Sequence, residues 1–521
     1  MLAAFHAAAN PNAIPAPHIE YRAILPMLIV FGVACVGVLV EAFVPRVHRA
    51  VTQTVLALAG LVAALVAVVA NTGLPRRLVV QSAVAADGPT LFIQGTILAL
   101  SIGALLLIAD RSIGADSDFV AQAADLPGTE QERASVRAGL RQTEVFPLAM
   151  FAVAGMMLFP AANDLVLAFV ALEVLSLPLY LLAGMARRRR LLSQEAAVKY
   201  FLLGAFSSAF FVYGLALVYG YAKSVEYGDI ATSLTSSDRG DSLVIVGLAL
   251  IGISLLFKLS GVPFHWWTPD VYQGAPTPIT AFMAAGTKVA AFGALLRVFF
   301  VAFGGLAWDW RPVVWGVAIA TMVVGAILGV TQTDVKRLLA YSSIAHAGFI
   351  LTAFAATTRA SESSVLFYLV AYGFMNIGAF AIVMLVRDAD GEANHLSRWV
   401  GLGRRSPLMA GIFALFLLAM AGLPPTSGLW AKVAVFQAAY QGGAGPLVIV
   451  GVLASAVTAY YYLRIIVLMF SQEPAVEGPT VVMPGALSAA AIALGVAVTI
   501  VLGVVPQTVL DLADKAVPFL R

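Results

Sequence analysis

The feature that most constrains this chain is a series of apolar runs, each about 20 residues long. An α-helix of that length crosses the roughly 30 Å hydrocarbon core of a bilayer. Because lipid offers the backbone no hydrogen-bond partners, such runs fold as helices that satisfy their own amides and carbonyls. About fourteen runs can be delimited, at residues 24–43, 50–70, 90–109, 145–161, 163–185, 195–222, 242–271, 278–304, 312–331, 337–356, 362–386, 407–440, 446–470 and 482–505. The sequence therefore predicts an all-α polytopic membrane protein.

Composition excludes several classes of function. Of the 521 residues, 61% are hydrophobic and 11% are charged, whereas soluble domains carry about 25% charged residues. The single cysteine, Cys35, allows no internal disulfide, no haem-attachment motif and no iron–sulfur cluster. The six histidines lack metal-site spacing, and neither a phosphate-binding loop nor a basic run interleaved with aromatics is present. We expect no metal, no cofactor and no nucleic acid on this chain.

Two of the predicted helices are interrupted by glycine and proline. Gly261 and Pro263 break the seventh, and Gly422, Pro424 and Pro425 break the twelfth. Broken membrane helices survive only where protein or water lines the break, and they mark the binding sites of transporters. Helices 4–8 and 9–13 each place a broken helix fourth. A shift of five helices inverts the second unit, so the order predicts two inverted five-helix repeats; the alternative is a coincidence in a chain rich in Gly and Pro.

These repeats define the expected domains. Residues 1–144 form three N-terminal helices and a polar loop, 145–304 the first repeat, 312–470 the second, and 482–521 the last helix and a tail. Loops after odd-numbered helices hold sixteen Lys and Arg residues, including the run 187–190, against nine on the other side. Positive charge accumulates on the cytoplasmic side. Both termini are therefore predicted on the outer side.

Lys258 lies in a hydrophobic stretch directly before the first break. A lysine at the centre of a membrane helix costs roughly 2.5–3.5 kcal/mol on insertion scales, so it is expected to be functional. Burial penalises the charged form of a lysine and so helps it release a proton. Together, the break and the lysine predict an ion or proton path.

Further charged residues fall inside predicted helices. Lys199, Lys288 and Lys432, together with Lys258, are expected to form a row of titratable groups at mid-depth. Glu173 is expected to pair with Lys199, in a functional or a purely structural ion pair. His265 and His346 are candidate relays, with structural histidines as the alternative.

Two other groups have simpler interpretations. Arg297 lies near a helix end, so its long side chain is expected to reach the membrane interface. Asp334 and Lys336 precede the tenth helix and are expected to form an ordinary interface pair.

Several motifs carry a family resemblance. They are Leu172-Glu173-Val174-Leu175-Ser176-Leu177-Pro178, Lys199-Tyr200-Phe201, Lys258-Leu259-Ser260-Gly261-Val262-Pro263-Phe264-His265-Trp266-Trp267-Thr268-Pro269-Asp270, Ala275-Pro276-Thr277-Pro278, Lys336-Arg337-Leu338-Leu339-Ala340-Tyr341-Ser342-Ser343 and Gly422-Leu423-Pro424-Pro425. With them the chain resembles the antiporter-like membrane subunits of respiratory complex I, the proton-pumping NADH:quinone oxidoreductase. Within that family it is most similar to the bacterial N type. The match covers about residues 145–470.

The resemblance implies a mechanism and a setting. The distance between Glu173 and Lys199 would tune the proton affinity of Lys258. Lys288 would connect Lys258 to Lys432, and Lys432 would release the proton. NADH, flavin, iron–sulfur clusters and quinone would lie on other subunits. The partners would be other membrane-arm subunits, including paralogous antiporter-like subunits and small K- and J-type subunits, together with lipid. The location would be a bacterial inner membrane.

Three alternatives remain open at the level of sequence. The chain could belong to a multisubunit cation/proton antiporter or to a hydrogenase-linked ion pump. It could also be a structural scaffold whose lysines only hold subunits together. The lysine at position 432 and the short segment after the last helix favour the complex I interpretation.

Overall fold

The computed structural model describes residues 19–520, apart from 114–116, 120–124, 127, 139, 187–189, 237–239, 389–390, 472 and 474–477. Most of the arginine run 187–190 therefore lies outside the described residues. In the first half the helices are α1 (Tyr21–Phe43), α2 (Arg46–Asn71), α3 (Gly88–Ala109), α4 (Glu130–Arg137), α5 (Val145–Leu158), η3 (Phe159–Ala161), α6 (Leu165–Ala183), α7 (Arg190–Ala222), α8 (Tyr227–Ser236) and α9 (Ser242–Leu259).

The second half continues from the first break to the C-terminal segment. Its helices are α10 (Trp267–Gly274), α11 (Thr277–Phe282), η4 (Met283–Thr287), α12 (Lys288–Arg297), η5 (Val298–Ala302), η6 (Gly304–Leu306), α13 (Ala307–Val330), α14 (Val335–Phe354), α15 (Arg359–Leu385), η7 (Leu396–Trp399), α16 (Leu402–Arg405), α17 (Pro407–Ala421), α18 (Ser427–Gln441), α19 (Gly445–Ser471), α20 (Ala486–Val504) and α21 (Gln507–Ala516).

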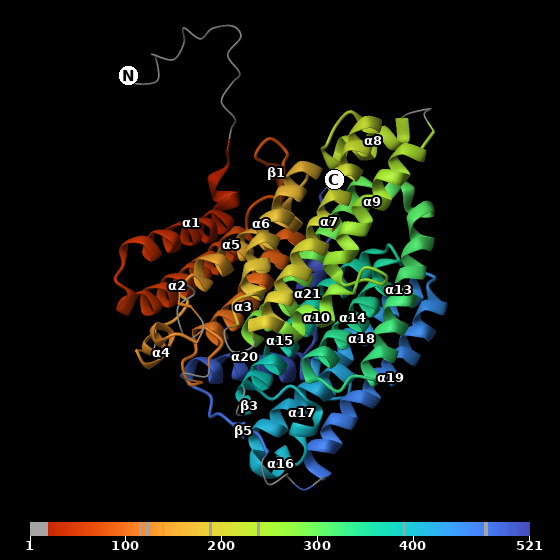
Figure 1. Ribbon diagram of the computed structural model, residues 1–521. Helices are drawn as coiled ribbons and strands as arrows, with labels where there is room; N and C mark the ends of the chain where they lie inside the picture. Colours follow the sequence, from red (N-terminus) through yellow and green to blue (C-terminus); the bar gives the residue numbers. More distant parts are fainter. Residues whose placement is uncertain are drawn as a thin grey trace, which may run out of the picture.

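Short strands occur only between helices in the described part. The antiparallel hairpin β1 (Arg77–Val79) and β2 (Val84–Ala86) joins α2 to α3. A second small sheet has the order β4-β3-β5, from β3 (Val386–Asp388), β4 (Gly391–Glu392) and β5 (Thr480–Val481). Figure 1 places β1, α8 and the C-terminus toward one end of the helical body, and α4, α16, β3 and β5 toward the other.

The prediction of an all-α polytopic membrane protein is confirmed. Eleven helices of the described chain are long and apolar enough to cross a membrane, and two shorter apolar helices accompany them. The number of fourteen membrane spans, the inverted repeats and the domain limits stay predictions. The short helices α4, α8, α16 and α21 were missed because none of them is an apolar run of spanning length.

Side chains at the helix starts explain where several helices begin. Asp164 accepts a hydrogen bond of 2.7 Å from the Leu167 amide at the start of α6. Thr358 forms a capping box with Ser361 that opens α15. These groups satisfy amides that have no partner inside the helix. The cap places the start of α15 at Arg359, three residues before the apolar run that predicted it.

Two helices form the centre of the molecule. All ten residues of α12 are buried, and most of α15 is buried along its length. By contrast α7 exposes large apolar side chains such as Phe206 and Tyr213, and α19 exposes Leu453. Apolar side chains that face outward suit a surface bathed in lipid. Polar groups carried on α12 and α15 are therefore held in the interior.

The expectation that Arg297 reaches the membrane interface is wrong. Its side chain is 0% exposed and its Nη2 lies 2.7 Å from Oδ1 of Asp87, which is also fully buried. Nε donates to the Pro160 carbonyl at 2.6 Å, and the guanidinium lies 4.8 Å from the Phe519 ring centroid. A buried carboxylate partner 210 residues away in sequence compensates part of the cost of burying this arginine. The pair also holds the C-terminal segment, because the Leu520 amide donates to Asp87.

Candidate functional site

The first helix break is closed by hydrogen bonds from neighbouring side chains. After α9 ends at Leu259, Ser260 takes a left-handed conformation with φ of 64° and the Val262–Pro263 peptide is cis. The indole of Trp267 donates to the Phe257 carbonyl at 2.8 Å, and the Val262 amide donates to the Thr321 hydroxyl at 2.9 Å. Protein groups thus replace the helical partners that the break removes, as lipid-embedded backbone requires.

Lys258 lies in an aromatic cage one residue before the end of α9. It is 3% exposed, and Nζ lies 3.5 Å from the Tyr200 hydroxyl. The ammonium lies 5.1 Å from the ring centroid of Tyr200 and 5.4 Å from that of Tyr180, within the range of cation–π attraction. Tyr200 in turn stacks on Trp267, with centroids 4.6 Å apart. The cage excludes water from Lys258 while its π-faces partly compensate the charge.

The predicted ion pair between Glu173 and Lys199 is absent. Glu173 on α6 accepts a short hydrogen bond from Ser208 of α7. Ser208 lies nine residues beyond Lys199 on the same helix, which is about 13.5 Å along its axis. Glu173 nonetheless lies on the helix α6 that also carries Tyr180, one wall of the Lys258 cage. The carboxylate is therefore bound by Ser208 and not by its expected partner.

Lys199 instead binds two other carboxylates. Its Nζ lies 2.6 Å from Asp270 of α10 and 2.7 Å from Glu195, one helical turn earlier. Asp270 also accepts a hydrogen bond of 2.5 Å from Arg337 on α14. Asp270 thus joins α7, α10 and α14 just after the break. The motif Trp267-Thr268-Pro269-Asp270 contains this residue, but sequence alone did not indicate that it binds Lys199.

Lys288 is the second buried lysine. It is 1% exposed at the start of α12, directly after the π-helical turn η4, and π-helical turns are frequent at functional sites. Nζ donates to the Ser343 carbonyl of α14 at 2.5 Å and lies 5.8 Å from the Tyr372 ring centroid. The contacts connect this lysine to α14 and α15.

His346 stands in a cluster of tyrosines next to Lys288. Its Nδ1 is 2.6 Å from the Tyr368 hydroxyl, and its Nε2 is 3.3 Å from the Tyr462 hydroxyl. Tyr462 makes a short hydrogen bond with Ser342 on the His346 side of α14. The ring of Tyr372, which contacts Lys288, lies 4.9 Å from the imidazole. Hydroxyls and an imidazole can exchange roles as donor and acceptor, which a proton relay requires.

The second break positions Lys432. Gly422 follows α17 with φ of 87°, and α18 begins at Ser427. Lys432 is 6% exposed, and Nζ donates to the Ala421 carbonyl at 2.9 Å and to the Ser455 hydroxyl at 2.8 Å. Its ammonium lies 5.1 Å from the Phe349 ring, and Phe349 contacts His346. Lys432 therefore satisfies a carbonyl that the break leaves free.

His265 is buried at the first break, and its role as a relay stays a prediction. The ring is 2% exposed and lies 4.7 Å from Trp266, whose side chain is largely exposed. In the described part no hydrogen bond joins it to Lys258 or to Lys288. The structure thus connects Lys288, His346 and Lys432 through aromatic residues, and leaves His265 beside the first break.

Lys336 is also placed differently from the expectation. Instead of pairing with Asp334, it is 1% exposed and its Nζ lies 3.1 Å from Glu392 and 2.7 Å from the Ala275 carbonyl. Asp334 caps α14 instead, accepting from the Arg337 amide at 3.0 Å. Asp118, from the polar segment after α3, lies beside Glu392, the carboxylate of this cluster. Burial and then the neighbouring Glu392 charge raise the pKa of Asp118.

Comparisons with known proteins match the part of the chain that contains these residues. The family described as NADH:quinone oxidoreductase/Mrp antiporter, transmembrane, matches residues 162–458, which include both breaks and all four lysines. NADH-quinone oxidoreductase subunit N of Acidothermus cellulolyticus is 93% identical over 517 residues, covering 99% of this chain and 100% of that protein. The subunit N of Rhodococcus opacus is 61% identical and covers 98% of both chains.

Solved structures agree with these matches. A chain of respiratory complex I from Thermus thermophilus has a TM-score of 0.75 at 32% identity, covering 94% of this chain and 99% of that one. A chain of the Mrp complex from a Dietzia species has a TM-score of 0.79 at 23% identity, covering 96% and 97%, which shows a shared fold. The chain therefore belongs to the family of antiporter-like membrane subunits found in NADH:quinone oxidoreductases and Mrp antiporters.

Proposed function

We propose that this chain is the N-type, proton-translocating membrane subunit of an NADH:quinone oxidoreductase. The observation that carries the proposal is the burial of Lys288, His346 and Lys432 around shared aromatic rings, inside a chain whose nearly full-length relative bears that name. Each of these groups binds and releases a proton, and none is aligned for covalent chemistry. The chain moves charge, while electron transfer takes place on other subunits.

In the proposed cycle Glu173 adjusts the proton affinity of Lys258 by changing its distance from the aromatic cage. Lys288 receives the proton, the His346 cluster passes it on, and Lys432 releases it beyond the second break. Each charge moved outward works against about 2.3 kcal/mol per 100 mV of membrane potential. A change of one unit in a carrier's proton affinity is worth about 1.4 kcal/mol. A swing of a few units at one lysine therefore matches the work to be done.

Lys199 has a distinct place in the proposal. Bound to Asp270, it lies away from Glu173 in this structure. If Lys199 left Asp270, its ammonium could approach Glu173. The charge of Glu173 would then be neutralised by Lys199 and would stabilise the protonated form of Lys258 less. Asp270 and Glu173 are thus two alternative partners of Lys199. Exchange of Lys199 between them would drive the cycle.

We also propose a membrane location and partner subunits for this chain. The chain lies in a bacterial inner membrane with both termini outward, beside paralogous antiporter-like subunits and small K- and J-type subunits. NADH, flavin, iron–sulfur clusters and quinone bind elsewhere in the complex. The Mrp antiporter has the same fold at lower identity, so the fold alone does not separate it from complex I.

The test is purification of the chain from its own membranes through an affinity tag. The proposal predicts that NADH dehydrogenase activity co-purifies and that deletion of the gene abolishes NADH-driven proton uptake by inverted vesicles. The control is sodium/proton exchange measured in the same vesicles without NADH. If that exchange disappears with the gene while NADH-driven proton uptake persists, the chain is an antiporter subunit instead.

A further inference from the structure

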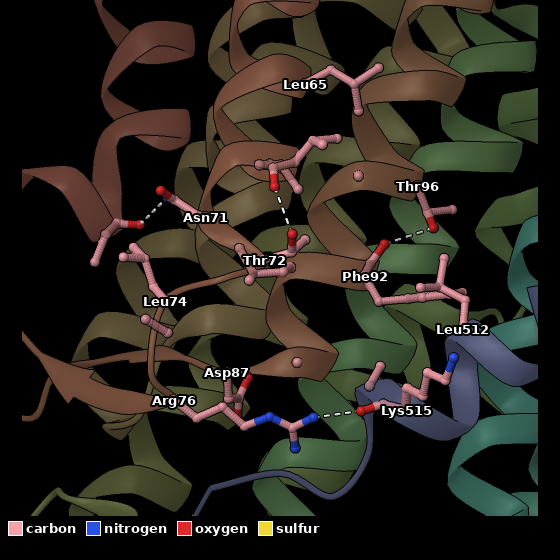
Figure 2. A pocket seen from close by; sticks show the side chains of 18 of the residues that line it. Leu65, Asn71, Thr72, Leu74, Arg76, Asp87, Phe92, Thr96, Leu512 and Lys515 are labelled. Carbon is pink, nitrogen blue, oxygen red and sulfur yellow. Dashed lines mark hydrogen bonds between the residues drawn. The ribbon is translucent and has the colours of Figure 1, made fainter.

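A groove lies far from the lysine row, at the end of the molecule near β1 and the C-terminus. It has a volume of about 480 Å³, within the roughly 300–1,000 Å³ typical of ligand pockets. Its apolar walls come from α2, α3, α15 and α21, and Figure 2 shows Leu65, Phe92 and Leu512 around it. Val69 and Leu512 are both more than half exposed, so the groove opens to the outer surface of the chain.

The polar side chains of the wall are already used within the protein. The amide of Asn71 donates to the Ala23 carbonyl, and the hydroxyls of Thr72 and Thr96 donate to the carbonyls of Val69 and Phe92 (Figure 2). Asp87, at the end of the groove where α3 begins, is neutralised by Arg297. An occupant of the groove therefore meets hydrocarbon along the wall.

Cations line one end of the groove. Arg77 is paired with Glu20 at 2.8 Å, but within the described residues no ion pair joins Arg76 or Lys515 to a carboxylate. The guanidinium of Arg76 donates to the Lys515 carbonyl, which brings these two exposed residues together (Figure 2). Each retains donors for an outside anion.

The dimensions of the groove match one leaflet of a bilayer. The charged end lies where α2 stops and α3 starts, and so at the ends of two spanning helices. From Gly88 to Ala99, both lining residues, α3 advances about 16 Å at 1.5 Å per residue. Half of the roughly 30 Å hydrocarbon core is about 15 Å. Cations at the interface and hydrocarbon to mid-depth are the arrangement that receives a phospholipid.

We propose that this groove binds a diacyl phospholipid with an anionic headgroup, taken from the surrounding bilayer. The phosphate lies against Arg76 and Lys515, and one acyl chain lies between α2 and α3. Basic pockets between membrane helices bind anionic headgroups in this way. A neutral quinone would leave both cations without a partner.

The test uses the intact complex in phosphatidylcholine nanodiscs, doped with phosphatidylglycerol that carries a photoactivatable diazirine in one acyl chain. After illumination, mass spectrometry locates the labelled peptides. Label is expected on residues 65–99 and 507–516. Lys515→Gln is expected to lower that label about fivefold, since a cation near anionic lipid contributes on the order of 1 kcal/mol. Gly95→Leu, which fills the groove, is expected to remove it.

Matched controls make the result decisive. Lys223→Gln removes an exposed cation at the end of α7 and is expected to leave the groove label unchanged. Phosphatidylcholine with the same diazirine chain is expected to label the groove weakly. Equal labelling by the two lipids, or no effect of Lys515→Gln, overturns the proposal. Displacement of the label by a quinone, or an unlabelled groove in the wild-type complex, overturns it as well. NADH oxidation by each variant reports intact assembly and is independent of this site.

Discussion

Lys199 and Asp270 form an ion pair of 2.6 Å that ties α7 to α10 immediately beyond the first helix break. The same carboxylate binds Arg337 of α14, so three helices meet at one group. Asp270 lies twelve residues after Lys258, on the far side of the break. Asp270 and Lys258 therefore flank the first break on its two sides.

This arrangement predicts that Asp270→Asn slows proton pumping about tenfold while the complex still assembles, because two cations lose one shared partner and Lys199 is no longer held beside α10. Glu195→Gln is the matched control, since Glu195 binds the same lysine but is 56% exposed. Exposed pairs contribute only about 0–1 kcal/mol, so that variant should pump nearly normally. Equal losses in the two variants would argue against a special role for Asp270.

The hydrogen bond from Ser208 of α7 holds the Glu173 carboxylate on α6, the helix that also carries Tyr180 of the Lys258 cage. Glu173→Gln keeps the shape and removes the charge, so NADH-driven proton uptake is expected to fall by about tenfold or more. Ser208→Ala keeps the charge and releases the carboxylate, and a smaller loss is expected. Initial rates of proton uptake in inverted vesicles measure both. A normal rate in Glu173→Gln would remove the carboxylate from the mechanism.

Tyr462 connects Ser342 to His346 through its hydroxyl. Tyr462→Phe removes only that oxygen, so the relay loses a link and proton uptake per NADH is expected to drop severalfold. Tyr460→Phe changes an exposed tyrosine on the same helix and is the control. The ratio of protons to NADH, measured in assembled complex, separates a broken relay from lost complex. Identical ratios in both variants would contradict the assignment of this cluster.

The buried pair Arg297–Asp87 predicts a stability effect distinct from transport. Asp87→Asn leaves an unpaired guanidinium in the interior, which costs about 3–5 kcal/mol. The expected result is a lower thermal midpoint of the complex in detergent and faster proteolysis of the C-terminal segment. Arg297→Met combined with Asp87→Leu removes both charges and should recover most of the loss. A midpoint unchanged by Asp87→Asn alone would mean that the pair does not hold the C-terminal segment.

Asp118 predicts a dependence on pH. Because the folded state raises the pKa of this carboxyl above the unfolded value, the folded protein binds the proton more tightly, and stability falls as pH rises from the unfolded value through the folded one. Asp118→Asn imitates the protonated form. It is expected to raise the thermal midpoint more at pH 8 than at pH 5. A larger gain at pH 5 would reverse the sign and refute the assignment.

Some of this architecture could be predicted from the chain alone because its causes are local. Spanning helices follow from apolar runs, and closely spaced Gly422 and Pro424 favour an interruption of the helix that contains them. Burial of Lys258, Lys288 and Lys432 follows from their position inside apolar runs, since lipid-facing lysines are costly.

The partners of charged groups could not be predicted, because they depend on contacts between distant segments. Lys199 finds Asp270 across 71 residues, and Arg297 finds Asp87 across 210. The order of the helices predicts Glu173 and Lys199 as neighbours on successive helices, but the two residues lie at different positions along the helix axes. The tyrosines around His346 were missed for the same reason: Tyr368 and Tyr462 lie on separate helices and look like ordinary core residues.

In the proposed cycle Lys258, seated in its aromatic cage beside the break, carries the pumped proton. Lys258→Met keeps the length of the side chain and removes the ammonium. In assembled complex we predict that NADH-driven proton uptake by inverted vesicles is abolished or nearly so, while Lys223→Gln leaves it intact. Proton uptake at the wild-type ratio to NADH in the Lys258→Met complex would contradict the account.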